Sequence, residues 1–183
     1  MPNLQCPSID MNFLVPNGFM FKVERLPKVS FFTQSIELPA LSLPALDVPT
    51  PLSVIEVPSD KLQFSTLNVP FIIDEKMENW IEVYKWMRGL GFPENYPQYS
   101  TENMVRNGIE GLSELQRNYS QASLVILGSN NVPVREFTFV DCFPVALSGI
   151  SFSSTNTDVQ YATATVELEY SYYYINGLDP DPI

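Results

Sequence analysis

The feature that most constrains the fold is the segment 160–175, QYATATVELEYSYYYI, in which two kinds of side chain alternate. Successive side chains of a β-strand point to opposite faces, so strict alternation predicts a strand with one buried face. The expected buried face carries Ala162, Ala164, Val166, Leu168, Tyr170, Tyr172 and Tyr174. The expected solvent face carries Tyr161, Thr163, Thr165, Glu167, Glu169, Ser171 and Tyr173.

Other segments also favour strands. Alternation predicts a strand over 19–32, and an apolar run predicts a buried strand over 62–73. Residues 122–127 and 133–140, separated by Gly128-Ser129-Asn130-Asn131, are typical of a β-hairpin. Together with 16 prolines and only 8 glycines, these segments predict a mainly β chain with short strands and stiff connections.

One helix is expected, over about residues 74–88. Asp74 is a good N-cap, and Arg88 falls in the last turn before Gly89. One apolar stripe is formed at helical spacing by Met77, Trp80, Ile81, Tyr84 and Met87. The sequence therefore predicts a β-sandwich or small β-barrel with one flanking α-helix.

Residues 38–58, LPALSLPALDVPTPLSVIEVP, combine apolar side chains with prolines at 39, 44, 49, 51 and 58. Proline has no amide donor for a central ladder, so this segment predicts an extended excursion or an edge strand. Exposed apolar side chains usually lie against another surface. We expect this segment to lie against another protein surface, through Leu43, Pro44, Leu46, Val48, Pro49 and Pro51. The alternative is an edge strand that covers its own core.

The expected domain organisation is simple, because 183 residues support a single domain. Residues 1–18 are expected to form an N-terminal arm, and residues 19–175 the β domain, with a loop over 89–121. Residues 176–183 are expected to form a flexible acidic tail. The chain lacks a run of about 18 apolar residues and a secretory signal, which predicts no membrane insertion and a reducing compartment.

The composition argues against common catalytic and metal chemistry. The chain has no histidine, which removes the usual general base and the usual metal ligand, and only two cysteines, Cys6 and Cys142. Glu167 and Glu169 form a pair of the kind that hydrolytic carboxylates use, but the favoured interpretation is a solvated acidic face of a sheet. We expect no enzyme activity, no cofactor and no metal. The net charge of −11 argues against tight binding of nucleic acid.

Two tryptophans on the expected helix, Trp80 and Trp86, lie six positions apart and so point in different directions. At least one is expected to leave the core and contact another protein, and Trp86 is included in the expected contact surface. A sheet protein with this many candidate exposed apolar residues suits a structural, assembling protein.

The order of segments resembles the tail tube protein of contractile-tailed bacteriophages of the T4-like kind. The resemblance lies in FKVERLP, then FFTQSIELPALSLPALDVPTPLSVIEVPSDKLQFSTLNVPFIIDEKMENW, SQASLVILGSNNVPVREFTFVDCFPVALSGISFSS and TATVELEY. Shared marks are the LPA turn, the proline-containing excursion, the strand–Asp–Glu–helix junction with a Trp, and the pattern FxxxxPVxLSxI. The similarity covers roughly residues 19–175, and the long N-terminal arm, the loop 89–121 and the acidic tail depart from it.

The resemblance implies hexameric rings that stack into a hollow tube inside a contractile sheath and carry double-stranded DNA during ejection. The implied partners are other copies of the chain, the tail sheath protein, and baseplate and tail terminator proteins. The implied location is the virion tail, assembled in the host cytoplasm. Close alternatives are a tube-initiating protein of the baseplate and a tube protein of a type VI secretion or contractile injection system. A monomeric β-sandwich binding module, lectin-like or a virion decoration, is the alternative from another class.

Two hypotheses place residues within such a tube. An acidic bore would repel its DNA cargo weakly, so Thr163, Thr165, Glu167 and Glu169 are expected to face the lumen. The extended segment is expected to join subunits, so deletion of 44–52 should yield a folded chain that cannot polymerise.

Overall fold

The computed structural model describes residues 14, 16–91, 118–152 and 161–176. The strands are β1 (Phe19–Val23), β2 (Leu41–Ser42), β3 (Ala45–Pro49), β4 (Val54–Pro58), β5 (Gln63–Phe64), β6 (Leu67–Ile72), β7 (Ser120–Leu127), β8 (Pro133–Leu147), β9 (Thr163–Glu169) and β10 (Tyr172–Asn176). The helices are α1 (Pro27–Phe31) and α2 (Glu78–Gly91). The mainly β fold that the sequence predicts is confirmed.

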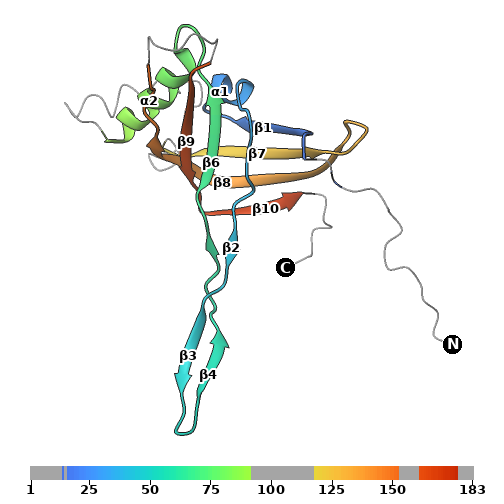
Figure 1. The fold of residues 1–183 in the computed structure, drawn as a ribbon, viewed down its shortest axis with the longest axis vertical. Helices are drawn as coiled ribbons and strands as arrows, with labels where there is room; N and C mark the ends of the chain where they lie inside the picture. Colours follow the sequence, from blue (N-terminus) through green and yellow to red (C-terminus); the bar gives the residue numbers. More distant parts are fainter. Residues whose placement is uncertain (1–13, 15, 92–117, 153–160, 177–183) are drawn as a thin grey trace, which may run out of the picture.

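One antiparallel sheet, in the order β1-β7-β8-β9-β6, forms the body, and β10 also pairs with β8. The long strand β8 pairs with three strands: Pro133–Cys142 with β7, Glu136–Val140 with β10, and Phe143–Leu147 with β9. Between the stretches that pair with β10 and β9, Asp141 has a positive φ of 57°, where the strand bends. The sheet therefore turns a corner, and β6 and β9 cross the direction of β1, β7 and β10 (Figure 1).

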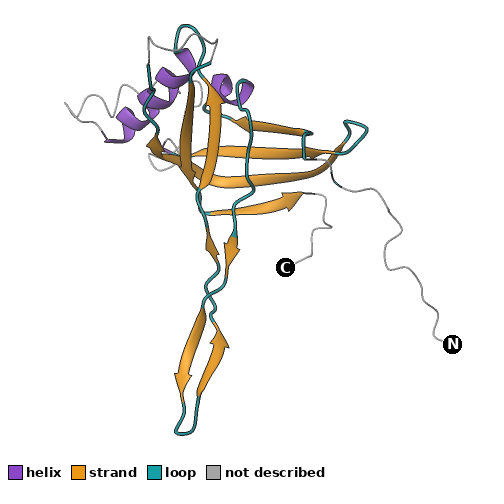
Figure 2. Ribbon diagram, viewed as in Figure 1, coloured by secondary structure: helices purple, strands orange, loops and turns teal. Residues whose placement is uncertain are grey.

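The core lies inside this corner and beneath the helices. Fully buried side chains come from both parts of the sheet and from both helices: Val23, Leu26, Val29, Leu67, Val69, Phe71, Val83, Phe139, Cys142, Val166 and Leu168. The buried residues of β9 are the alternate positions Ala164, Val166 and Leu168, as the sequence pattern predicts. Helices α1 and α2 lie at one end of the body, and strands β2, β3, β4 and β5 project from the opposite end (Figure 2).

The alternation of the last strand ends earlier than predicted. The chain leaves the strand conformation at Tyr170 and Ser171, so β9 and β10 are separate strands that lie along different stretches of β8. After this break the phase changes: Tyr172 and Tyr174 are exposed, and Tyr173 packs against the core. The prediction that Tyr172 and Tyr174 belong to the buried face is therefore wrong.

The strand expected over 19–32 is shorter, because a helix replaces its second half. Helix α1 begins at Pro27, whose fixed φ and missing amide suit a first helical position. The Ser30 amide donates to the carbonyl of Leu26, and the Ser30 hydroxyl bonds to the same oxygen. This one-turn helix buries Val29 beside β1.

Helix α2 also differs from its prediction in its start, in its buried face and in its end, which lies at Gly91 instead of before Gly89. Met77 has a φ of 55°, so the helix begins only at Glu78, and the Asp74 carboxylate accepts the amide of Asn79 at 3.1 Å. The buried residues are Asn79, Val83, Trp86 and Gly89, whereas Ile81 and Tyr84 of the predicted stripe are exposed. On this rotated face the polar residue Asn79 turns inward, and its Nδ2 donates to the carbonyl of Ile72 at 2.7 Å.

The predicted hairpin of 122–127 and 133–140 is confirmed by the pairing of β7 with β8 around Gly128. The strand predicted over 62–73 is divided, with β5 outside the body and β6 inside it. Most of the expected N-terminal arm, loop and acidic tail lies outside the described residues, namely at 1–13, 15, 92–117 and 177–183. The proposed domain division therefore stays a prediction.

Candidate functional site

Residues 41–64 project from the body as a narrow ribbon, which we call the arm (Figure 1). Strand β2 pairs with β5 near the body, and β3 pairs with β4 farther out. Every side chain of β3 and β4 is exposed. The predicted contact residues Leu43, Pro44, Leu46, Val48, Pro49 and Pro51 all lie on this arm and are all exposed.

The outer half of the arm has two different faces. The cross-strand pairs Leu46–Val57 and Val48–Ile55 put four apolar side chains on one side, which we call the apolar face of the arm. A two-stranded hairpin is only marginally stable alone in water, and contiguous exposed apolar side chains mark contact surfaces. The apolar face of the arm is therefore the strongest candidate for a protein interface among the described residues.

The opposite face of the arm is mixed, because a pair of carboxylates lies between the apolar pairs Ala45–Pro58 and Pro49–Val54. Asp47 lies directly across from Glu56 in the β3–β4 register, and both residues are exposed. Like charges in directly opposed positions destabilise a strand pair. This pair reduces the stability of the arm on its own and leaves the apolar face as the side suited to burial.

The second candidate surface is the solvent face of β9. Thr163, Glu167 and Glu169 are exposed, and Thr165 is half-buried, so the alternation that the sequence predicts holds here. Thr165 and Glu167 also line a groove of about 560 Å³ together with Ser35, Ile36, Glu37, Asn68 and Pro70. Glu37 and Glu167 make this groove acidic.

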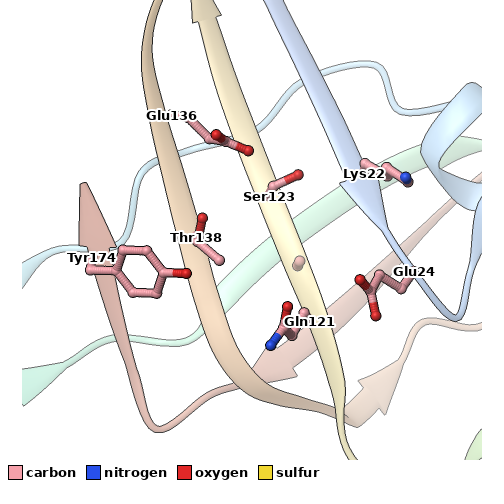
Figure 3. A pocket seen from close by; sticks show the side chains of 8 residues that line it. Lys22, Glu24, Gln121, Ser123, Glu136, Thr138 and Tyr174 are labelled. Carbon is pink, nitrogen blue, oxygen red and sulfur yellow. The ribbon is translucent and has the colours of Figure 1, made fainter. Parts of the chain in front are cut away.

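A third surface was not anticipated from the sequence. On the outer side of β1, β7, β8 and β10, polar side chains gather around an open pocket of about 230 Å³ (Figure 3). The strand register places Lys22, Ser123, Thr138 and Tyr174 in one row across the four strands. The pocket wall also includes Glu24, Gln121 and Glu136. Only the pairing of distant strands brings these residues together, although their alternate spacing in each strand is visible in the sequence.

The expected contact role of Trp86 is wrong. Its side chain is 2% exposed, its Nε1 donates to the Asn118 carbonyl at 3.3 Å, and the Arg25 guanidinium lies 4.9 Å from its ring centroid. Trp80 is the tryptophan that reaches the surface, where its ring stacks on Tyr84 at 5.6 Å. The six-residue spacing correctly separates their directions, but it does not tell which direction faces the core.

The titratable groups offer little catalytic chemistry. Within the described ranges, no cluster of three or more His, Cys, Asp or Glu residues is arranged to hold a metal ion. Burial raises the pKa of the Cys142 thiol to about 12, so this thiol stays protonated at neutral pH. No helix among the described residues is long and apolar enough to cross a membrane.

The contact between the two helices contains a half-buried carboxylate. Lys28 of α1 forms an ion pair with Glu78 of α2, and this contact lowers the pKa of Glu78. Burial raises the pKa of Glu82, whose Oε2 is enclosed without a hydrogen-bond partner. Because the folded chain then holds the Glu82 proton more tightly than the unfolded chain, ionisation of Glu82 opposes folding as pH rises through this range.

We therefore expect Glu82→Gln to raise the melting temperature at pH 7 by about 1–2 °C, a small effect because the group is only half-buried. This gain in melting temperature should disappear near pH 4, because the protonated carboxyl of Glu82 is then as neutral as the amide of the Gln variant. Thermal unfolding followed by circular dichroism at the two pH values measures this. An equal shift at both pH values would show that the charge of Glu82 is not the cause.

Comparisons with known proteins come from sequence and from structure. The sequence is 25% identical over 165 residues to the tail tube terminator protein of Enterobacteria phage T4, covering 86% of each chain. No protein-family model matches the sequence. The fold matches the tube-terminating cap of the anti-feeding prophage with a TM-score of 0.62 at 11% identity, covering 94% of this chain and 97% of that one.

A second structural match is a chain of the sheath/tube terminator of the extracellular contractile injection system PVC, in its extended state. The TM-score is 0.55 at 11% identity, with 91% of this chain and 99% of that chain covered. At such low identity the structural matches establish the fold alone. The sequence match to a tail tube terminator supports a tail-tube-associated structural protein. The structural matches show that the chain shares its fold with a tube-terminating cap and a sheath/tube terminator.

Proposed function

We propose that this chain is a tube terminator, a ring-forming protein that ends the tail tube of a contractile tail. The observation that carries the proposal is the sequence similarity to a tail tube terminator over 86% of both chains. This revises the role expected from the sequence, a main tube subunit whose rings stack repeatedly, to one that occupies one end of the tube. The proposed location is the virion tail, with assembly in the host cytoplasm.

The proposed partners follow from that role. Copies of the chain form a hexameric ring, and one side of the ring meets the last ring of the tube. The tail sheath protein surrounds this junction, and double-stranded DNA passes through the ring during ejection. We assign the contact with neighbouring subunits to the arm, because its apolar face is exposed in the isolated chain. Leu43, Pro44, Leu46, Val48, Pro49 and Pro51 remain the proposed contact residues.

Electron microscopy with gold-labelled antibodies against this chain tests the proposal on purified tails and on tubes stripped of sheath. A terminator gives label at the head-proximal tube end only. Label along the whole tube would overturn the proposal in favour of a main tube protein, and label at the baseplate end would overturn it in favour of a tube initiator. The amount of chain relative to the main tube subunit, measured by quantitative mass spectrometry of the same tails, gives an independent check.

We further propose that the solvent face of β9, with Thr163, Thr165, Glu167 and Glu169, lines the channel. Its carboxylates would repel the phosphates of passing DNA. Replacement of both glutamates by lysine should leave the ring intact, because both side chains are exposed. The new ammonium groups should slow DNA ejection by about ten-fold at low salt and less at high salt, since contacts with phosphates weaken as salt rises.

The measurement is the rate of DNA release from purified virions in which the variant replaces the wild-type chain. The matched control combines Glu24→Lys with Glu75→Lys, which changes the net charge equally at exposed positions outside β9 and outside the arm. Unchanged ejection in the β9 variant, or equal slowing in the control, would refute the channel assignment.

A further inference from the structure

The arm meets the body through a small set of hydrogen bonds, all of which involve Ser65. The amide of Ser65 donates to the carbonyl of Ala40 at 3.1 Å, and the Ala40 amide donates to the Ser65 hydroxyl at 2.8 Å. These two bonds tie together the two chain segments that enter and leave the arm. The carbonyl of Ser65 accepts a third bond, from the hydroxyl of Tyr170, at 2.9 Å.

Tyr170 belongs to the body rather than to the arm. It follows directly after β9, at the point where the chain turns from β9 into β10, and its side chain is only 8% exposed. Its ring packs edge-on against Phe139 of β8, with 5.1 Å between centroids. The position of its hydroxyl is therefore set by the core.

Aromatic contacts strengthen this connection at Phe64, the residue before Ser65. Phe64 of β5 packs edge-on against Tyr170 at 5.9 Å and against Tyr173 at 5.5 Å. Farther out, the outer strands β3 and β4 expose all of their side chains. The direction of the arm is thus decided at its base, where Tyr170 supplies both a ring contact and a hydrogen bond.

We propose that Tyr170 is a positioning residue, which holds the arm in one orientation relative to the body. The functional meaning rests on the proposed role of the arm in subunit contact. An arm that is already oriented loses less conformational freedom when it docks, so association costs less free energy. The loss of Tyr170's hydroxyl should release the arm without exposing the core, because the phenyl ring can remain against Phe139.

The test uses two spin labels on the free full-length chain, with Cys6 replaced by serine. One label is placed at Leu52, which is 98% exposed at the arm tip, and the other at Val132 in the exposed turn between β7 and β8. Cys142 is buried with its pKa raised to about 12, so it should not take a label. Pulsed electron resonance then gives the distribution of tip-to-body distances.

In Tyr170→Phe we expect the population of arms outside the wild-type distance peak to rise about five-fold, the factor that corresponds to a bond worth about 1 kcal/mol. Tyr174→Phe is the matched control, because it removes the hydroxyl of a half-exposed tyrosine on β10. A wild-type distribution in Tyr170→Phe, or equal broadening in Tyr174→Phe, would overturn the proposal.

A second variant keeps the test decisive if Tyr170→Phe folds poorly. Phe64→Leu keeps an apolar side chain at the arm base and retains Tyr170, but it removes the ring contacts, and it should broaden the distribution in the same way. A role confined to stability would lower the melting temperature and leave the distance distribution unchanged, which would also overturn the proposal. Because the measurement needs no tail, its failure is distinguishable from failure of the terminator assignment.

Discussion

A variant in which a short Asn-Gly turn replaces residues 44–59 should fold normally and fail to join the tube. Strands β3 and β4 contribute nothing to the buried core, and the Ser59 amide closes the hairpin onto the Pro44 carbonyl. Removal of the whole hairpin therefore leaves no unpaired strand. Deletion of 44–52 alone, which the sequence suggests, would remove β3 and leave β4 without its partner.

We expect the affinity of this variant for tube ends to fall at least about 100-fold, because a few apolar anchors carry most of the energy of a typical interface. Co-sedimentation with tubes, together with electron microscopy of tails assembled without the wild-type chain, measures the loss. The point variant Leu46→Ser with Ile55→Ser should reproduce most of it, since both side chains lie on the apolar face of the arm.

The control replaces Val132 and Val134 by serine, which removes two similarly exposed apolar side chains from the β7–β8 region. The control should bind tubes as the wild type does. The arm assignment fails if the hairpin variant still occupies tube ends, or if the control loses binding to the same degree. Circular dichroism and thermal unfolding establish that each variant is folded before binding is compared.

The second large effect concerns the core. Replacement of Trp86 by alanine should lower the free energy of unfolding by about 3–5 kcal/mol, the usual cost of deleting a large aromatic side chain from a packed interior. The loss includes the contact with the Arg25 guanidinium and the hydrogen bond to Asn118. Because whole domains are stable by only about 5–15 kcal/mol, this variant should be close to unfolding at 37 °C.

Urea denaturation followed by fluorescence measures this difference, with Trp80→Ala as the matched control. Trp80 is partly exposed and stacks on Tyr84, so its removal should cost about 1 kcal/mol. Equal losses in the two variants would contradict the assignment of Trp86 to the core. A stable Trp86→Ala chain that fails only in assembly would restore the contact role that the sequence suggested.

Several features could be predicted because they depend on short stretches of chain. The alternation in TATVELE predicts a half-buried strand, and Thr163–Glu169 form one with Ala164, Val166 and Leu168 inward. The proline-spaced apolar segment predicts an extended excursion, and it forms the arm. The contact and channel roles assigned to these two segments are still predictions.

Other features could not be predicted because they depend on partners distant in the chain. The apolar stripe predicted for the helix includes Trp80 and not Trp86, and only the packing against β8 and the core puts Trp86 inside. The four-strand pocket around Ser123 and Thr138 exists only after β1, β7, β8 and β10 pair. A sequence-based search has no local signal for such a surface.

The sequence by itself determined the strand periodicity, the stiff apolar excursion and the poverty of catalytic side chains, because backbone geometry and side-chain chemistry act within a few residues. The tertiary structure alone decided where the last strand breaks and which way the arm points. At Tyr170 the pattern of the sequence continues unchanged, but β8 bends at Asp141 and offers its two stretches to two separate strands. After Tyr170 the other set of alternate side chains faces the core, because the strand that a segment pairs with decides which of its faces is buried. The fold, and not the local sequence, sets that pairing.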